Sequence, residues 1–266
     1  MNISSKAATV LYRKDNHSCI VFSDLVEGHG VQANQFLIID ENHTALIDPG
    51  GDLTYTPLSI EISKHVSLQE LDYIFASHQD PDIIASLPRW MMHSHCKVVT
   101  PKLWSRFLPH LASSFITDKL SASVDDRIIG VPDEGQKIPF GRDHIICLPA
   151  HFLHSVGNLN FYDPVSKILF SGDMGASIVD SHAADPVDDF ATHIKLMEGF
   201  HRRYMTSNKA CRLWAKMVSQ LDVQMIVPQH GRPFVGRTMI AQFLKWISGL
   251  KCGVDLMSEQ NYQIIK

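Results

Sequence analysis

The sequence lacks the features that define several large classes of protein. No uncharged apolar run approaches the roughly 20 residues of a membrane-spanning helix, and the opening residues, MNISSKAATVLYRKDNHS, carry charges where a signal peptide has an apolar segment. The five cysteines are scattered without a CxxC pair, so no disulfide framework is expected. These absences predict a cytoplasmic protein that does not enter the membrane.

Basic residues are too few to predict a nucleic-acid-binding surface. Lys and Arg number 24 against 28 Asp and Glu, a formal net charge of −4, whereas a surface that follows phosphates needs clustered Lys and Arg. Histidine, in contrast, is abundant: there are 15, as many as glycines. Because histidine binds metals and transfers protons near neutral pH, candidate functional residues are expected among the histidines.

Short apolar segments alternate with helical patterns, and no linker, repeat or low-complexity segment interrupts them. This alternation predicts one α/β domain over residues 1–266. Expected strands are 8–13, 18–25, 36–39, 45–48, 73–76, 97–100, 144–150, 167–173 and 223–230. Expected helical segments are 57–72, 83–95 with an interruption at Pro88, 186–220 and 238–250.

Four of the expected strands end at side chains that can bind a metal. A rigid sheet holds ligands at its strand ends at fixed separations, which is what a metal centre requires. The candidate ligands, in chain order, are His78, Asp80, Asp82, His154 or His151, Asp173 and His230. The His-x-Asp-x-Asp loop by itself is a weak signal that is more typical of a solvated turn, so the prediction depends on all four strand ends together.

The order of these segments resembles the metallo-β-lactamase superfamily. The hairpin GVQANQFLIIDENHTALIDPG comes first, and HQDPD, PxHxxHSVGN, LFSGD and VPQHG follow in that order. More narrowly, the chain looks like the di-iron domain of flavodiiron proteins and of their flavodoxin-less relatives, the oxygen-binding di-iron proteins. The resemblance covers nearly the whole chain and implies a single-domain, four-layer αβ/βα sandwich.

The carboxylate of Asp80 favours the di-iron branch. In the hydrolytic branches this loop reads His-x-His-x-Asp-His and builds nitrogen-rich zinc sites, whereas flavodiiron proteins have Glu at the second position. A carboxylate there suits iron or manganese better than zinc. Together, Asp80, Asp82 and Asp173 offset three of the four charges of two divalent ions, which leaves a weakly positive centre suited to dioxygen.

The resemblance implies two non-heme iron ions that share Asp173. His78, Asp80 and His154 would complete the first site, and Asp82 and His230 the second. Ile83 departs from the family pattern, which has His there, so the second ion is expected to be open, weakly held or missing. Asp80 is also one methylene shorter than the expected Glu.

The third imidazole is expected to be His154 rather than His151. The resemblance implies this choice: counted back from the strand 167–173, the ligand spacing of the flavodiiron domain reaches His154. The segment His154-Ser155-Val156-Gly157-Asn158 also resembles the HTxG ligand turn of the superfamily. His151 would then stand behind the ligands or on the surface. Tyr204 is a candidate for the wall of a dioxygen pocket, and core packing is its alternative.

The leading functional hypothesis is a protein that binds dioxygen, or nitric oxide, and acts as an oxygen or redox sensor or a reductase component. Only 36 residues follow His230, too few for an FMN-carrying flavodoxin domain, so a separate electron donor or signalling partner is expected. The resemblance also implies a homodimer. The alternative is a zinc-type hydrolase of esters, thioesters or phosphodiesters. The 56 residues at 174–229 are too few for the extra domain of the superfamily's nucleases, which argues against nucleic-acid processing.

Overall fold

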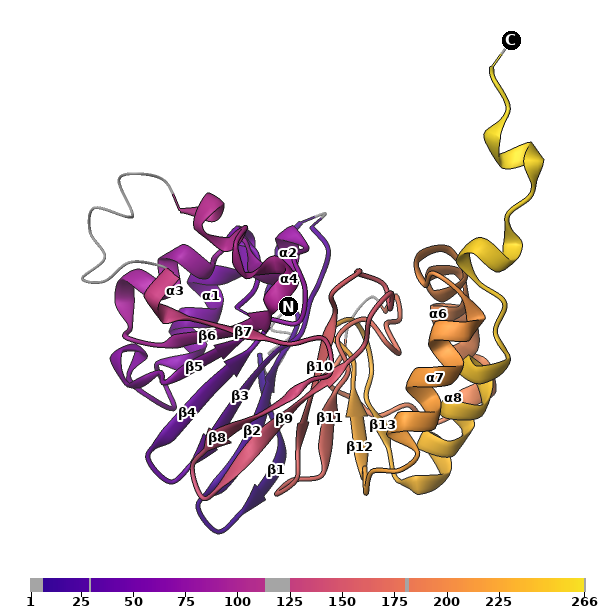
Figure 1. Cartoon of the computed structure of the whole chain (residues 1–266). Helices are drawn as coiled ribbons and strands as arrows, with labels where there is room; N and C mark the ends of the chain where they lie inside the picture. The colour runs from indigo at the N-terminus through magenta and orange to yellow at the C-terminus, as the bar shows by residue number, and fades with distance from the viewer. Residues whose placement is uncertain (1–6, 29, 113–124, 180–181, 266) are drawn as a thin grey trace.

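Two β-sheets pack face to face, and helices cover the outer face of each (Figure 1). The computed structural model describes residues 7–28, 30–112, 125–179 and 182–265. The first sheet, in spatial order, is β1 (Ala8–Lys14), β2 (His17–Phe22), β3 (Gln35–Asp40), β4 (His43–Ile47), β5 (Tyr73–Phe75), β6 (Lys97–Pro101) and β7 (Ile128–Val131). The second, in spatial order, is β13 (Phe234–Val235), β12 (Met225–Val227), β11 (Ile168–Phe170), β10 (Leu159–Asp163), β9 (Asp143–Pro149) and β8 (Gln136–Phe140).

The helices divide between the two outer faces. The first sheet is covered by α1 (Asp52–Ile62), α2 (Pro81–Ile84) and α3 (Leu87–His93), with α4 (Lys102–Ser105) beside β6 and β7. The second sheet is covered by α6 (Phe190–Tyr204), α7 (Asn208–Val218) and α8 (Arg237–Gly249). Within the described residues, no helix is both long and apolar enough to cross a membrane.

Alternating side chains in the central strands build the hydrophobic layers. In β2, Ile20 and Phe22 pack with residues of α1–α3, while Cys19 and Val21 pack with residues of the second sheet. A period of two is what a strand buried on both faces requires. Between the sheets, Phe36 and Phe170 lie with ring centroids 5.0 Å apart. The expected four-layer αβ/βα sandwich is therefore confirmed.

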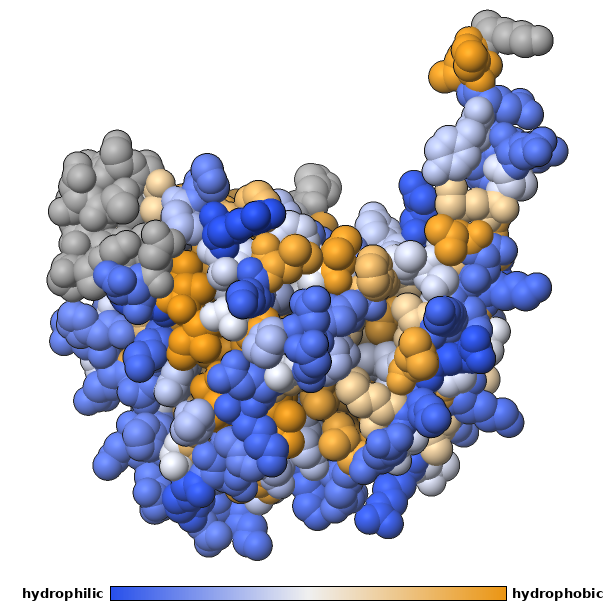
Figure 2. Space-filling view, viewed as in Figure 1, coloured by the Kyte–Doolittle hydropathy of each residue, from blue (hydrophilic) through white to orange (hydrophobic). Residues whose placement is uncertain are grey.

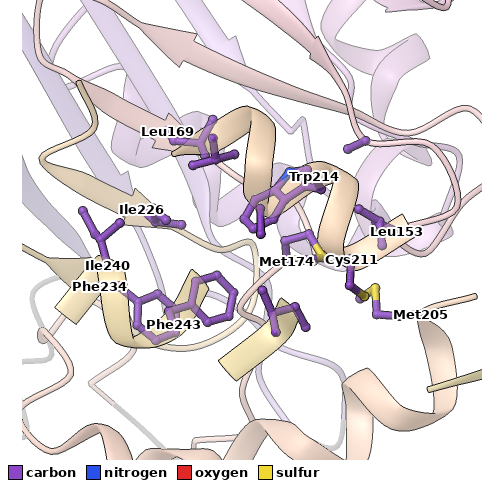
Figure 3. Packing of buried hydrophobic residues seen from close by; sticks show 14 of the residues in the cluster. Leu153, Leu169, Met174, Met205, Cys211, Trp214, Ile226, Phe234, Ile240 and Phe243 are labelled. Carbon is purple, nitrogen blue, oxygen red and sulfur yellow. The ribbon is translucent and has the colours of Figure 1, made fainter. Parts of the chain in front are cut away.

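The helical layer over the second sheet has its own aromatic core (Figure 3). The rings of Phe234 and Phe243 stack with centroids 4.4 Å apart, and Trp214 meets Phe243 edge-on. The Trp214 indole also donates a hydrogen bond of 2.6 Å to the Asn160 side chain of β10. This contact fixes α7 on the sheet, because a buried indole N–H needs a partner.

Most expected elements are present, with some changes of boundary. The hairpin of β3 and β4 and the final helix are confirmed. The interruption expected at Pro88 lies slightly earlier: α2 ends at Ile84 and α3 begins at Leu87, with Pro88 in its first turn. The helix expected at 57–72 is wrong in extent: α1 begins at Asp52, ends at Ile62 and is followed by a short 3-10 turn that Ser67 caps. Strands β7, β8, β10 and β13 were not anticipated; β8 has three exposed positions and β13 has two residues.

A buried ionic network joins the two sheets where β2 begins and β10 ends. His17 lies between two carboxylates, with Nε2 2.7 Å from Asp163 Oδ2 and Nδ1 3.3 Å from Asp40 Oδ1. Arg142 in turn donates to Asp40 at 2.8 Å. Burial lowers the pKa of His17, but the hydrogen bonds and charges of Asp163 and Asp40 outweigh it, so the pKa is raised above 6.5. The protonated imidazole balances charges that would otherwise be buried alone.

We expect this network to make stability depend on pH. Because the pKa of His17 is raised by folding, its contribution is fully present below pH 6.5 and is lost as the pH rises through the folded-state pKa. His17→Gln should lower the free energy of unfolding below pH 6.5 by about 3 kcal/mol and flatten this slope in urea titrations. His95→Gln, at an exposed histidine, should keep the slope; an unchanged slope in His17→Gln would contradict the assignment.

Candidate metal centre

The predicted ligands come from strand ends at one edge of the sandwich. His78 follows β5, Asp80 caps α2, and Asp82 lies in the first turn of α2. Asp173 follows β11 and His230 follows β12. Because β4, β5 and β6 run parallel, as do β11 and β12, their carboxyl ends point to a common edge. The loop between β9 and β10 adds His154.

Four of these residues form one tight group. One donor atom each from His78, Asp80, His154 and Asp173 lies within 4.8 Å of all the others. His154 Nε2 is 2.9 Å from Asp173 Oδ2 and 3.1 Å from Asp80 Oδ2. His78 Nε2 lies farther from the same two oxygens, at 3.5 Å and 3.7 Å. Two imidazoles and two carboxylates thus converge on one small volume.

The remaining two predicted ligands form a second group on the other side of Asp173. His230 Nε2 is 3.5 Å from Asp82 Oδ2 and 3.5 Å from Asp173 Oδ1. Asp173 therefore presents Oδ2 to the first group and Oδ1 to the second. This is the arrangement that a carboxylate bridging two ions requires.

Main-chain and hydroxyl groups orient the histidines from behind. The Nδ1 atom of His78 lies 2.9 Å from Ser77 Oγ, and the Nδ1–H of His230 donates to the Gln32 carbonyl at 2.6 Å. Each ring then directs Nε2 to the centre, as in metal sites whose ligands are held by a second set of contacts. Asp48 accepts from the Ser77 N–H at 2.7 Å, and burial raises the pKa of Asp48 to about 6. No sequence pattern predicts a role for Gln32, Asp48 or Ser77. Their contacts with the site depend on the fold, and the residues beside them in the sequence form no motif.

The residues present fit a pair of metal ions. His78 Nε2 and Asp173 Oδ1 are buried and have no hydrogen-bond partner within the described structure. These atoms lie 3.5–3.7 Å from the donor atoms that face them. Such distances are longer than a hydrogen bond, but they match the separation of two ligand atoms that each lie about 2.1 Å from a shared ion. A nitrogen and oxygen donor set without sulfur suits iron, manganese or zinc.

Ile83 explains why the second group has fewer donors. Its side chain is fully buried and packs in the core beneath α1–α3, so it offers nothing to the centre. Asp82, Asp173 and His230 are then the donors left to a second ion, which stays predicted to be open, weakly held or missing. That these residues bind metal stays a prediction.

The charges of the group depend on one another strongly when no metal is bound. Hydrogen bonds from His154 and His78 hold the pKa of Asp80 well below its ordinary range. Burial lowers the pKa of His154, but hydrogen bonds to Asp173 and Asp80 outweigh it and raise that pKa to about 10. Buried carboxylates therefore hold protons on the imidazoles, and divalent cations can take their place.

The structure separates His154 from His151. His154 is in the first group, whereas the Nε2–H of His151 donates to the Asp133 carbonyl at 2.7 Å. Tyr204 lies near the centre: its ring is 5.5 Å from that of His154 and stacks on Phe200 at 4.7 Å. Both aromatic residues line a cavity of about 550 Å³ that reaches the candidate ligands.

Fold and site together define a metallo-β-lactamase-type protein with a histidine–carboxylate metal centre. The "ODP family beta lactamase" profile matches residues 31–231, more than half of the chain. The chain therefore belongs to the ODP family.

Solved structures of the family are similar over almost their whole length. The structure titled "Peroxy diiron species of chemotaxis sensor ODP" matches with a TM-score of 0.82 and 36% identity, covering 96% of this chain and 99% of that one. The apo state of the chemotaxis sensor ODP from T. denticola has the same identity and coverage and a TM-score of 0.80.

More distant relatives share the fold. The rubredoxin oxygen:oxidoreductase from Desulfovibrio gigas matches with a TM-score of 0.72 and 16% identity, covering 90% of this chain and 61% of that one. An uncharacterized protein of Methanocaldococcus jannaschii is 26% identical over 204 residues, which is 76% of this chain and 49% of that protein. A relative from Synechocystis sp. is 27% identical over 215 residues, 76% of this chain and 32% of its own length.

The two histidines of the β9–β10 loop provide a matched test. His154→Ala removes one of four donors from the first group, so the metal content of the purified protein should fall by about one ion per chain. His151→Ala removes a contact to the Asp133 carbonyl and should leave the metal content unchanged. Elemental analysis measures both; equal losses in the two variants would contradict the assignment.

Asp82 provides a test of the second group alone. In Asp82→Ala, only Asp173 and His230 face the second position, so one ion should be lost while the first is retained. Loss of both ions would mean that the two positions load together. Retention of both would place Asp82 outside the ligand set.

Proposed function

We propose that this protein is a non-heme di-iron protein that binds dioxygen and senses it. The observation that carries the proposal is the placement of Asp173, whose two carboxylate oxygens face two separate groups of histidine and aspartate donors. His78, Asp80 and His154 would complete the first iron site, and Asp82 and His230 the second. Two ferrous ions held side by side by these residues would each supply one electron to a ligand such as dioxygen or nitric oxide.

The residues around the centre suit the capture of a small, weakly polar ligand. Phe200 and Tyr204 line the cavity beside His154, and an apolar wall favours dioxygen over water. The second group has fewer donors, so it offers the more accessible coordination position. Tyr204 is half exposed and lines this cavity, and its hydroxyl would donate a proton or a hydrogen bond to a ligand there.

We favour sensing over repeated turnover as the role of this centre. Repeated reduction of dioxygen would need an electron donor outside these residues, whereas a sensor needs a partner that reads the state of the centre. The chemotaxis sensors among the solved relatives support this reading. A ferrous centre suits a reducing compartment, so we retain the cytoplasm as the proposed location and a homodimer as the proposed assembly.

Metal analysis and optical spectra of anaerobically purified protein test the proposal. We expect about two irons per chain and a visible charge-transfer band that develops when air is admitted. Asp173→Asn should lose both irons and the band, because it weakens a ligand of each ion. His151→Ala is the matched control and should behave like the parent protein.

The same experiment separates the alternative hydrolase. Two zinc ions per chain, no optical change in air and hydrolysis of an activated ester or phosphodiester would replace the oxygen-binding proposal. The Asp80 carboxylate, in place of the histidine of the hydrolytic loop, argues against that result.

A further inference from the structure

Two cysteines of the helical layer lie side by side as free thiols. Cys211 is in α7, and Cys252 immediately precedes the 3-10 turn Gly253–Leu256 that follows α8. Their sulfurs are 3.8 Å apart and both side chains are fully buried. A disulfide has a sulfur–sulfur distance of about 2.0 Å, so a small approach would bring the two atoms to bonding distance. Figure 3 shows Cys211 beside Met205 at the margin of the core.

Hydrogen bonds to main-chain groups hold the turn after Cys252 against the segment that precedes Cys211. The Val254 N–H donates to the Thr206 carbonyl at 2.9 Å. Asp255 accepts from the N–H of Asn208 at 2.6 Å and from the N–H of Cys252 at 3.2 Å. The turn is therefore docked on the junction between α6 and α7, next to the first turn of α7, which contains Cys211.

Gly253 is what allows this close approach. Its φ is +51°, a conformation that L side chains rarely adopt, and a Cβ atom there would lie within 2.2 Å of the Thr206 carbonyl oxygen. The backbone geometry that brings the sulfurs together thus depends on a specific residue choice and not on a chance contact of two side chains.

The other cysteines are in different surroundings. Cys19 donates to the Asp163 carboxylate at 3.5 Å, and Cys96 lies beside the Arg127 guanidinium. Cys147 is buried between the sheets. In the described structure none of these three has another thiol in hydrogen-bonding range, so Cys211 and Cys252 are the pair suited to a bond.

We propose that Cys211 and Cys252 form a reversible disulfide when the protein meets a two-electron oxidant such as hydrogen peroxide. One thiolate attacks a peroxide oxygen and becomes a sulfenic acid, and the peroxide bond breaks to release water. The second sulfur then displaces the sulfenic oxygen, which leaves as water, and the S–S bond forms. Two thiols and one peroxide give one disulfide and two waters, and the two electrons come from the sulfurs.

The exposed turn controls the access of the oxidant. Burial raises the pKa of both thiols, so neither is a ready thiolate in the closed structure. Val254 is 56% exposed and Leu256 40%, and opening this short turn breaks the hydrogen bonds that dock it at Thr206 and Asn208. Oxidation is therefore gated by a local opening, and the disulfide is shielded from reductants once the turn closes.

The bond would cross-link two segments that meet at the end of α6. That helix ends at Tyr204, and the turn docks on Thr206 shortly after it. The same helix carries Phe200 and Tyr204 into the cavity beside His154. The disulfide would therefore restrain the C-terminal end of the helix that forms the aromatic wall. This inference concerns the thiols and does not rest on the proposed oxygen binding.

Disulfide mapping of the intact, metal-loaded protein tests the proposal. Reduced protein is treated with hydrogen peroxide and, separately, with diamide, which oxidises thiols without peroxide chemistry at iron. Remaining thiols are alkylated in denaturant and the chain is digested without reduction. We expect a linked Cys211–Cys252 peptide, lighter by two hydrogen atoms than the sum of its parts, that disappears on treatment with dithiothreitol.

Variants and the parent chain together decide the outcome. Cys252→Ser should lose the linked peptide and leave Cys211 open to alkylation, while Cys147→Ser, at another buried cysteine, should retain the linkage. Full alkylation of both thiols in the oxidised parent chain would overturn the proposal, as would linkage of either one to Cys19, Cys96 or Cys147. The parent-chain result does not depend on whether a variant folds.

Discussion

The site is organised around one buried carboxylate. Asp173 is 2% exposed, and a charge so placed is stable only with partners around it. Its partners come from both sheets: His78 follows β5 of the first, while His230 follows β12 of the second. The need to surround this carboxylate with three imidazoles therefore sets how the two sheets meet at that edge.

The two sides of Asp173 differ, and the difference bears on function. On one side, four donors lie close together with the aromatic rings of Phe200 and Tyr204 nearby. On the other, Ile83 is absorbed into the core and leaves three donors. A crowded position and an open one on the same bridging residue suit a centre that holds its ions while it exchanges a small ligand.

Charge is also buried between the sheets at His17, but there it is used differently. The His17 imidazole is enclosed by Asp40 and Asp163, and Arg142 completes the balance of charge. Protein groups alone balance the charge of this network. The carboxylates of the site instead line a cavity that a metal ion can enter.

The sequence by itself predicted the layer architecture, through its resemblance to the metallo-β-lactamase superfamily, and the six candidate ligands. An apolar run that stops at His or Asp is a local signal, readable from neighbouring residues. The alternation of apolar side chains with a period of two indicates which face of a strand points inward. The sequence favoured His154 over His151, whereas the tertiary structure alone showed that His154 joins the first group and that His151 contacts the Asp133 carbonyl. It also decided which oxygen of Asp173 faces which histidine, and it brought Cys211 beside Cys252 across 41 residues. These depend on how distant segments approach in space, and no local pattern records that distance.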